Sequence, residues 1–439
     1  MARKKTATVN SRGATRRRYW WQLRQQWRML GVFEIDTEHE FYHLTTTMKE
    51  GLQTAIEASM DTPVPEDTLT AEHFKAVETQ RHQGFEIETF AAPVFAKLRS
   101  SLDMTEREYV NSLCSGGNYL QFVSNSKSKA DFFVTNDKRF FLKTQSRREV
   151  QFLLSNLQAY MDHLEKNPHS LMVRFLGVHR IIIPHQFKKY FIVMQSVFYP
   201  DERINIRYDV KGCEVGRWTN PDTDGKQIIK VLKDNNFEGQ FITLGPEKPW
   251  FVDQVKLDAA FLKELNVLDY SLLLAHQPLH RDELRGKRSL ANFVVRATKS
   301  LDMDVSPTES QPPTFPLLRD EEQQEQQEQQ EQQEETDSPD CVSEGIQLQE
   351  MNGRTDSPLQ EFHEHHHRLL PNCKNAVHVI DGPERRYFVG IIDIFTVYNW
   401  KKKLENVWKN LRFPGRDFST VRPDKYSSRF CQWIQNRTK

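Results

Sequence analysis

The sequence predicts a mixed α/β protein of the α+β kind, built on antiparallel strands and interrupted by a long disordered acidic insert. Two observations predict this class. Ser126–Thr144 has the pattern of a β-hairpin, because two aromatic runs flank a turn signal at Thr135–Lys138. Much further along, Glu321–Glu335 is a Glu-Gln low-complexity tract, which cannot bury enough apolar surface to offset its chain entropy.

Composition is that of a globular protein without a membrane span. The 439 residues suffice for one large core or two modest ones, and 38% of them are hydrophobic. No apolar run approaches the length of a transmembrane helix, and the N-terminus lacks the apolar stretch of a secretory signal. Five scattered cysteines without a C-x-x-C pair predict reduced thiols. We therefore expect a cytoplasmic protein.

The net charge of zero conceals segregated charges. Residues 1–30 hold nine Lys/Arg and no acid, and residues 401–439 hold eleven Lys/Arg against three acids. Such basic ends suggest an anionic partner, either a lipid surface or nucleic acid, although ordinary solubility charge explains them about as well. No recognisable nucleic-acid-binding module accompanies them, so we expect no nucleic-acid partner.

The elements before the hairpin are short. Aromatic residues in Tyr19–Leu30 alternate with arginines as in a short amphipathic helix, which is either a membrane-surface anchor or a terminal helix packed on the domain. A helix is expected at Phe41–Ser59, ended by the prolines of Asp61–Pro65. Two further short elements are expected at Phe85–Phe95 and Glu106–Cys114.

After the hairpin, apolar spacing predicts a helix at Arg147–His163. Strands are then expected at Met172–Phe175, Arg180–Ile183, Tyr190–Val197 and Ile204–Lys211. Val255–Leu274 carries apolar residues at helical spacing, which predicts a helix that ends in Leu268–Ser271. From about Leu279 to Asp381 the chain does not look folded, and Arg386–Val397 then has the composition of a buried strand.

Inside the polar insert, His363–His367 matches H-E-x-x-H, the helix pattern of zinc metalloproteases. That pattern requires a stable helix in a folded domain, whereas its flanks here are of low complexity. A stray histidine tract is the better interpretation.

Phosphoryl transfer requires cations that hold phosphates, carboxylates that hold Mg²⁺, and a carboxylate near the attacking hydroxyl. A lysine on the second strand of a hairpin is where kinase-like folds hold ATP phosphates, and Lys143 has this position. An aspartate inside an apolar strand, such as Asp393, needs a metal or a cation beside it. In chain order the candidates are Lys143, Glu149, Lys211, Asp269 and Asp393.

Three blocks of sequence resemble the signature motifs of the phosphatidylinositol phosphate kinases. They are Arg207–Gly212 (RYDVKG), Leu268–Leu273 (LDYSLL) and Gly390–Ile394 (GIIDI). The resemblance runs from about Phe41 to the C-terminus apart from the insert, and that family has an acidic insert between its second and third blocks. It implies a two-lobed kinase fold with antiparallel sheets and with ATP and Mg²⁺ between the lobes.

The resemblance also implies roles for single residues. ATP binding falls to Lys143, with Glu149 as its partner, and Mg²⁺ binding falls to Asp393. Asp269 takes the place of the catalytic aspartate, with Leu268 where the family motif has Met. Lys211 takes the place of the lysine near the transferred phosphate, and Arg217 that of a substrate-binding arginine.

Beyond Asp393 the family has a membrane-binding activation loop, which corresponds to residues of about 395–424. Lys402, Lys403 and Glu405 lie in K-K-L-E, which resembles the type I version of that loop. Leu404, Val407, Trp408 and Leu411 share one helical face, as in a helix that lies on an anionic membrane. An ordinary surface helix is the alternative.

The expected organisation is a basic and aromatic N-terminal segment, an N-terminal lobe, a C-terminal lobe in two pieces, and the insert. Their respective boundaries are 1–35, 36–200, 201–280 with 376–439, and 281–375. One departure from the family concerns the loop before the hairpin. Ser126 and Lys129 stand where type I kinases have two glycines, and side chains there crowd the nucleotide phosphates. Asp131 adds a like charge, which Lys127 and Lys129 partly offset.

Two hypotheses follow. The first is a regulatory homologue with weak or no activity, a scaffold at the membrane periphery that pairs with type I phosphatidylinositol 4-phosphate 5-kinases. The second is an active kinase, which would transfer the ATP γ-phosphate to phosphatidylinositol 4-phosphate and form homodimers or hetero-oligomers. The complete set of catalytic residues favours the second hypothesis, and the glycine-free loop favours the first by a small margin.

Overall fold

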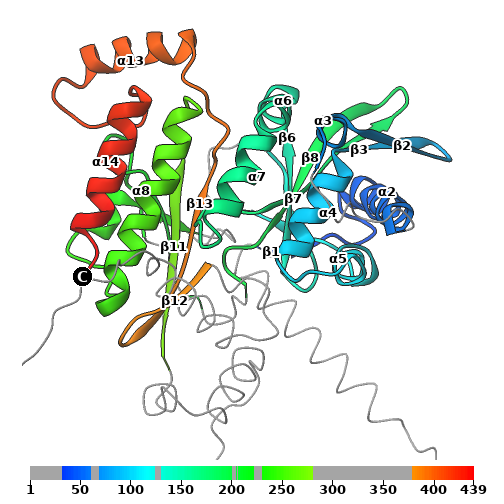
Figure 1. Cartoon of the computed structure of the whole chain (residues 1–439), viewed down its shortest axis with the longest axis horizontal. Helices are drawn as coiled ribbons and strands as arrows, with labels where there is room; N and C mark the ends of the chain where they lie inside the picture. Colours follow the sequence, from blue (N-terminus) through cyan, green and yellow to red (C-terminus); the bar gives the residue numbers. More distant parts are fainter. Residues whose placement is uncertain are drawn as a thin grey trace, which may run out of the picture.

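The computed structural model describes residues 32–60, 69–123, 130–199, 204, 206–221, 230–279 and 378–439. Two β-sheets, each with its own helices, lie side by side (Figure 1). This confirms the predicted two-lobed α+β fold with antiparallel sheets. The predicted N-terminal amphipathic helix, the acidic insert and the histidine tract His363–His367 lie outside the described residues.

The first lobe contains an eight-stranded sheet in which every neighbouring pair is antiparallel, in the order β1-β4-β5-β6-β8-β7-β3-β2. Its strands are β1 (Val32–Glu34), β2 (Val77–His82), β3 (Phe85–Phe90), β4 (Leu120–Phe122), β5 (Phe132–Val134), β6 (Phe140–Gln145), β7 (Phe175–Ile183) and β8 (Phe187–Gln195). The predicted hairpin is confirmed as β5 and β6. Its turn closes through a hydrogen bond from the Lys138 amide to the Thr135 carbonyl (2.9 Å).

Two clusters of buried residues, one of which includes the fully buried Ile87, Phe133 and Leu142, join this sheet to its helices. These helices are α2 (Tyr42–Met60), α3 (Ala71–Lys75), α4 (Ala92–Ser101), α5 (Glu106–Val110) with a π-helical turn (Asn111–Ser115), α6 (Arg147–Ser155) and α7 (Leu157–Lys166). The single helix predicted at 147–163 is therefore two helices. The break is at Asn156, whose side chain donates to the Phe152 carbonyl (2.7 Å) and closes the end of α6.

The second lobe contains a five-stranded sheet in the order β10-β9-β11-β13-β12. Its strands are β9 (Ile206–Val210), β10 (Val231–Lys233), β11 (Ser271–Pro278), β12 (Val379–Asp381) and β13 (Arg385–Ile392). The pair β9–β10 is parallel, an exception to the otherwise antiparallel pairing. The helices are α8 (Lys248–Glu264), α13 (Trp400–Arg412) and α14 (Pro423–Asn436), with short 3-10 turns at Asp234–Phe237 and Gly245–Glu247.

The helix predicted to reach Leu268 ends four residues earlier, at Glu264. Asn266 adopts a left-handed backbone (φ 58°), which stops the helix. The Leu268 amide then donates to the Thr396 carbonyl (2.9 Å), so this segment pairs with the chain that follows β13. Its apolar residues belong to that pairing and to β11 rather than to a helical face. The strand predicted at 386–397 likewise ends early, at Ile392.

The two lobes are joined through the segment just before β7 and the end of β13. The Ile391 amide donates to the Leu171 carbonyl (2.7 Å), and the Val173 amide donates to the Ile391 carbonyl (2.9 Å). Phe175 and Phe395 pack beside this junction with ring centroids 5.1 Å apart. The end of β13 is therefore held against the first lobe, immediately before Asp393. Across the described ranges, no helix combines the length and the apolarity needed to cross a membrane.

Candidate active site

Three candidate residues lie at one end of the second sheet. Lys211 directly follows β9, Asp269 lies two residues before β11, and Asp393 directly follows β13. The register pairs Val210 with Leu272, and Ser271 with Ile392. Antiparallel pairing thus places the end of β9, the start of β11 and the end of β13 at the same edge. Residues about 180 positions apart in the chain meet there for this reason.

Lys211 is bound to Asp269 by two contacts. Its Nζ lies 2.8 Å from Asp269 Oδ1 and 2.6 Å from the Asp269 carbonyl oxygen. Burial lowers the pKa of Lys211, but the carboxylates of Asp269 and Asp209, with Asp393 beyond them, more than reverse this and raise its pKa above the ordinary value. Lys211 therefore stays charged at neutral pH.

Lys143 on β6 crosses from the first lobe to the second, where its Nζ lies 2.8 Å from Asp393 Oδ1. The same ammonium lies 5.2 Å from the centroid of the Phe132 ring on the neighbouring strand. Partial loss of water contact would raise the pKa of Asp393, but Lys143 and then Lys211 reverse this and lower its pKa. The expectation that Asp393 meets a cation is confirmed, although its side chain is half exposed rather than buried.

Asp269 and Asp393 both have left-handed backbones, with φ values of 66° and 61°. Side chains other than glycine seldom adopt this conformation, and aspartate tolerates it better than most. In both cases the residue sits where a strand meets a loop, and its carboxylate points to a lysine. Strain of this kind is concentrated at functional sites.

Asp234 holds in place the loop that begins at Lys211, directly after β9. Asp234 was not identified from the sequence. Its Oδ1 accepts hydrogen bonds from the backbone amides of Lys211 (2.8 Å), Gly212 (2.7 Å) and Cys213 (3.3 Å). Gly212 is required there, because it has φ 65° and an added Cβ would lie 3.1 Å from the Phe430 Cα of α14. The buried carboxylate of Asp234 thus fixes the direction of the Lys211 side chain.

Arg217 completes this support. Its Nε lies 2.6 Å from Asp234 Oδ2, and its guanidinium also contacts the carbonyl and the carboxylate of Asp209. Arg217 is buried. Burial lowers the pKa of its guanidinium, but the carboxylates of Asp209 and Asp234 outweigh this effect, so the pKa lies above its ordinary value. These contacts give Arg217 a positioning role, and its substrate-binding role remains a prediction.

Glu149 does not pair with Lys143 in this structure. It occupies the third position of α6, where its Oε2 accepts hydrogen bonds from the Ser146 amide (2.9 Å) and hydroxyl (2.6 Å). Ser146 and Glu149 form a capping box, in which the two residues satisfy each other's helix-end donors. The expected pairing is therefore wrong, because the helix start engages Glu149 and Asp393 engages Lys143.

Asp131 does not point its charge at the Lys143 site. Its Oδ2 lies 2.9 Å from Lys189 Nζ on β8, and its amide is bonded to the Thr144 hydroxyl (2.8 Å). The ion pair neutralises the like charge that was expected to repel phosphates. The other residues of this loop, Ser126, Lys127 and Lys129, lie outside the described residues.

Helix α13 carries the remaining predicted residues away from the cluster. Glu405 anchors its inner side, with Oε1 2.7 Å from Lys409 Nζ, Oε2 3.0 Å from Lys402 Nζ, and a hydrogen bond from the Thr420 hydroxyl (2.8 Å). Partial burial raises the pKa of Glu405, but these hydrogen bonds reverse this and lower it to about 2. Lys403, on the same helix, has no hydrogen-bond or ion-pair side-chain partner within the described part of the chain.

The structure thus brings together four of the predicted residues, Lys143, Lys211, Asp269 and Asp393. It places Glu149 at a helix start, Arg217 beneath the Lys211 loop, and Lys402, Lys403 and Glu405 on α13. Among the described residues, no group of three or more His, Cys, Asp and Glu is arranged to hold a metal ion by itself. The three cysteines in this part of the chain, Cys114, Cys213 and Cys431, are free.

Comparison with known proteins gives a consistent result. Residues 113–437 match the family model described as Phosphatidylinositol-4-phosphate 5-Kinase. The chain is 45% identical over 426 residues to the Phosphatidylinositol 4-phosphate 5-kinase-like protein 1 of Homo sapiens, with 97% of this chain and 94% of that protein covered. The Mus musculus protein of the same name is 40% identical, with coverages of 97% and 93%. A probable phosphatidylinositol phosphate kinase of Dictyostelium discoideum is 30% identical, with coverages of 80% and 47%.

Proposed function

Because this chain belongs to the phosphatidylinositol-4-phosphate 5-kinase family, we propose that it docks on anionic membranes and regulates catalytically active relatives there. Its own phosphoryl transfer is weak or absent. The single observation that carries the docking part is the outer face of α13. Membrane docking and weak phosphoryl transfer rest on different residues, so each has its own test.

The outer face of α13 is a continuous apolar surface. The side chains of Trp400, Leu404, Val407, Trp408 and Leu411 are 53% to 79% exposed, and α13 buries none of its residues. Since Glu405 and Asn406 bond the inner side of the helix to Thr420, the apolar side faces away from the protein. In Figure 1, α13 projects from the end of the second lobe above α8 and α14. Tryptophans among lysines suit the boundary between lipid headgroups and acyl chains.

Kinases of this family use ATP, and the donor set of the cluster fits ATP with Mg²⁺. Asp393 is half exposed and ionised beside two cations, so its carboxylate is available for a metal once phosphates engage Lys143. Lys143 would then hold the nucleotide phosphates, Lys211 the transferred or substrate phosphate, and Asp269 the attacking hydroxyl. When bound, Mg²⁺ supplies neutralisation of the charge on the phosphates.

Weak catalysis is inferred from the loop that should cover the phosphates. Backbone amides approach phosphate oxygens closely only where no Cβ intervenes, and this loop has Ser126 and Lys129 in place of glycines. A displacement of 1 Å at the reacting atoms can cost about 100-fold in rate. A protein with this defect but an intact docking helix is suited to bring active relatives to a membrane.

An active phosphatidylinositol 4-phosphate 5-kinase is the second candidate. The observation that favours it is the assembled cluster, in which both lysines reach a carboxylate at 2.8 Å. The neutralised charge of Asp131 favours it as well, since one of the two obstacles to nucleotide binding is smaller than expected.

We expect the purified full-length chain to phosphorylate phosphatidylinositol 4-phosphate in vesicles at a rate close to that of Asp393→Asn. Ser126→Gly combined with Lys129→Gly should tighten nucleotide binding and raise turnover by roughly 10- to 100-fold, because the two side chains no longer crowd the phosphates. Radiolabelled ATP and lipid extraction measure turnover. Robust wild-type activity that Asp393→Asn abolishes would establish the active kinase instead. Unchanged nucleotide binding in the glycine variant would refute the account of the loop.

We also expect the chain to co-precipitate with type I phosphatidylinositol 4-phosphate 5-kinases at native expression levels. The matched control is a variant in which charged residues replace the apolar residues of α13. It should lose membrane binding and still co-precipitate with the partner kinase. The absence of any co-precipitated kinase would contradict the regulatory role and leave docking unaffected.

A further inference from the structure

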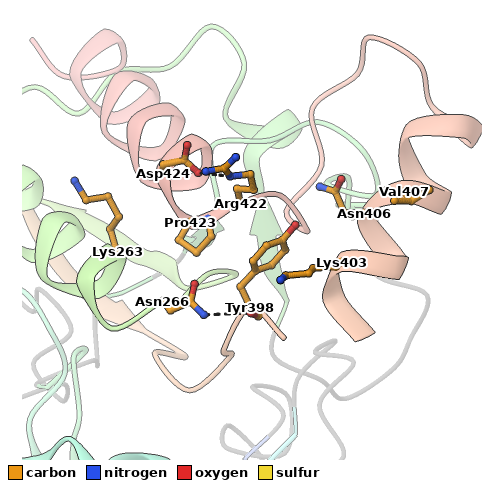
Figure 2. A pocket seen from close by; sticks show the side chains of 9 residues that line it. All are labelled: Lys263, Asn266, Tyr398, Lys403, Asn406, Val407, Arg422, Pro423 and Asp424. Atoms are coloured by element: carbon orange, nitrogen blue, oxygen red, sulfur yellow. Dashed lines mark hydrogen bonds and ion pairs between the residues drawn. The ribbon is translucent and has the colours of Figure 1, made fainter. Parts of the chain in front are cut away.

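A hollow of about 680 Å³ lies under α13, bounded by the end of α8, the segment before α13 and the start of α14. Figure 2 shows Lys403 and Asn406 extending into it from α13, with Tyr398 between them and the start of α14. None of the four residues of the catalytic cluster lines this hollow. It is therefore a different site from the one described above.

Positive charge dominates its lining. Lys263, Lys403 and Arg422 contribute three cations, against one carboxylate, Asp424, which lies 3.2 Å from Arg422 and pairs with it. The amides of Asn266 and Asn406 and the Tyr398 hydroxyl add uncharged polar groups. Such a lining favours a ligand with several negative oxygens.

Lys263, Lys403 and the Tyr398 hydroxyl have no hydrogen-bond or ion-pair partner in the ranges that the structure describes. Two other lysines of α13, Lys402 and Lys409, provide a contrast. Glu405 pairs with both, whereas Lys403 lies about half a helical turn from that carboxylate and extends into the hollow instead. The helix thus divides its cations between an internal anchor and an unneutralised group.

Hydrogen bonds that do not involve the cations hold the walls of the hollow in place. Tyr398 and Asn266 are joined by two hydrogen bonds, from the Tyr398 amide to the Asn266 carbonyl (3.0 Å) and from Asn266 Nδ2 to the Tyr398 carbonyl (3.1 Å). Asn406 Nδ2 donates to the Thr420 carbonyl (2.7 Å) on the opposite side. These bonds fix the walls without using the two ammonium groups or the hydroxyl.

We propose that this hollow binds the phosphorylated headgroup of an anionic lipid, separately from the catalytic cluster. Val407 supports a lipid, because it lines the hollow and also belongs to the exposed apolar face of α13. A headgroup held here would leave its acyl chains beside that face. The proposal goes beyond membrane docking, since it requires a stoichiometric site that a soluble headgroup can also occupy.

Calorimetric titration of the full chain with soluble inositol 1,4,5-trisphosphate tests the site without any membrane. Lys263→Ala combined with Lys403→Ala should weaken binding about 10- to 30-fold, given about 1 kcal/mol for each lysine beside an anionic headgroup. The matched control is Lys256→Ala with Lys401→Ala, which removes the same charge from the same two helices outside the hollow. Lys211→Ala should keep the component of binding that the test pair removes, because that lysine belongs to the catalytic cluster and does not line the hollow.

Equal losses in the test and control pairs, or a loss only in Lys211→Ala, would overturn the proposal. Vesicles of phosphatidylcholine with and without phosphatidylinositol 4,5-bisphosphate distinguish the two sources of the headgroup. The test pair should lose the lipid-dependent part of vesicle binding. If it weakens trisphosphate binding and leaves vesicle binding unchanged, the ligand is a free phosphate ester and the lipid assignment is wrong.

Discussion

Replacing Asp234 by alanine should lower the free energy of unfolding by roughly 3–5 kcal/mol, the range typical when one partner of a buried ion pair is removed. The substitution leaves the buried Arg217 guanidinium without its closest carboxylate. It also deprives the amides of Lys211, Gly212 and Cys213 of their acceptor. Urea denaturation followed by tryptophan fluorescence and circular dichroism measures the loss.

Two controls make this test specific. Asp234→Asn keeps the shape and one amide acceptor, so it should lose less stability than Asp234→Ala. Asp253→Ala removes an exposed aspartate whose one ion-pair partner among the described residues is Lys256 at 3.0 Å, and it should change stability by about 0.5 kcal/mol or less. An Asp234→Ala protein that unfolds at the wild-type urea concentration would show that the Arg217–Asp234 pair does not hold the loop.

Asp234 was not predictable from the sequence, in contrast to other parts of the fold. The hairpin, α2 and the three blocks were predictable, because each is encoded by neighbouring residues or by a family motif. Asp234 belongs to no such motif, since its partners lie 17 to 23 positions away on another turn. The polar residues around Asp234 have the composition of a surface turn, so the sequence does not indicate that this aspartate is buried. Its role becomes visible only when β9 and β10 pair in parallel and bring the two turns together.

The errors at helix ends have a similar cause. The apolar Leu268 continued the helical spacing of α8, yet Leu268 and its neighbour Val267 are buried where they pair with the chain after β13. Glu149 was assigned to Lys143 from its position on the next helix, whereas a capping box needs only Ser146 three residues earlier. In both cases the hydrogen-bonding needs of a helix end, which the side-chain pattern does not show, determined the observed structure.

Four of the predicted residues do lie together, and the register explains why they meet. Lys211, Asp269 and Asp393 each lie beside one end of a strand in the same sheet. Because these neighbouring strands pair antiparallel, a motif that includes such a strand end also determines the edge of the sheet at which the residue lies. Lys143 needed in addition the junction between β13 and the segment before β7, which no local pattern encodes.

Trp408→Glu combined with Leu411→Glu should reduce binding of the full chain to anionic vesicles by at least about 100-fold. Burying a large apolar side chain contributes roughly 1.5–3 kcal/mol, and two of them correspond to that factor or more. The new carboxylates add repulsion from the anionic surface. Vesicle co-sedimentation measures the partition, and the fold should survive because both side chains are more than half exposed.

The matched control places the same charges on apolar side chains elsewhere. Val77→Glu and Leu257→Glu change residues that are 52% and 50% exposed, on β2 and α8, and so remove similar groups without touching α13. If both pairs weaken vesicle binding equally, net charge rather than the α13 face controls docking. If the α13 pair leaves vesicle binding intact but alters the sedimentation coefficient of the protein, the face binds another copy of the chain. Only selective loss of vesicle binding fits a helix whose inner side is anchored by Glu405 and whose outer side contacts lipid.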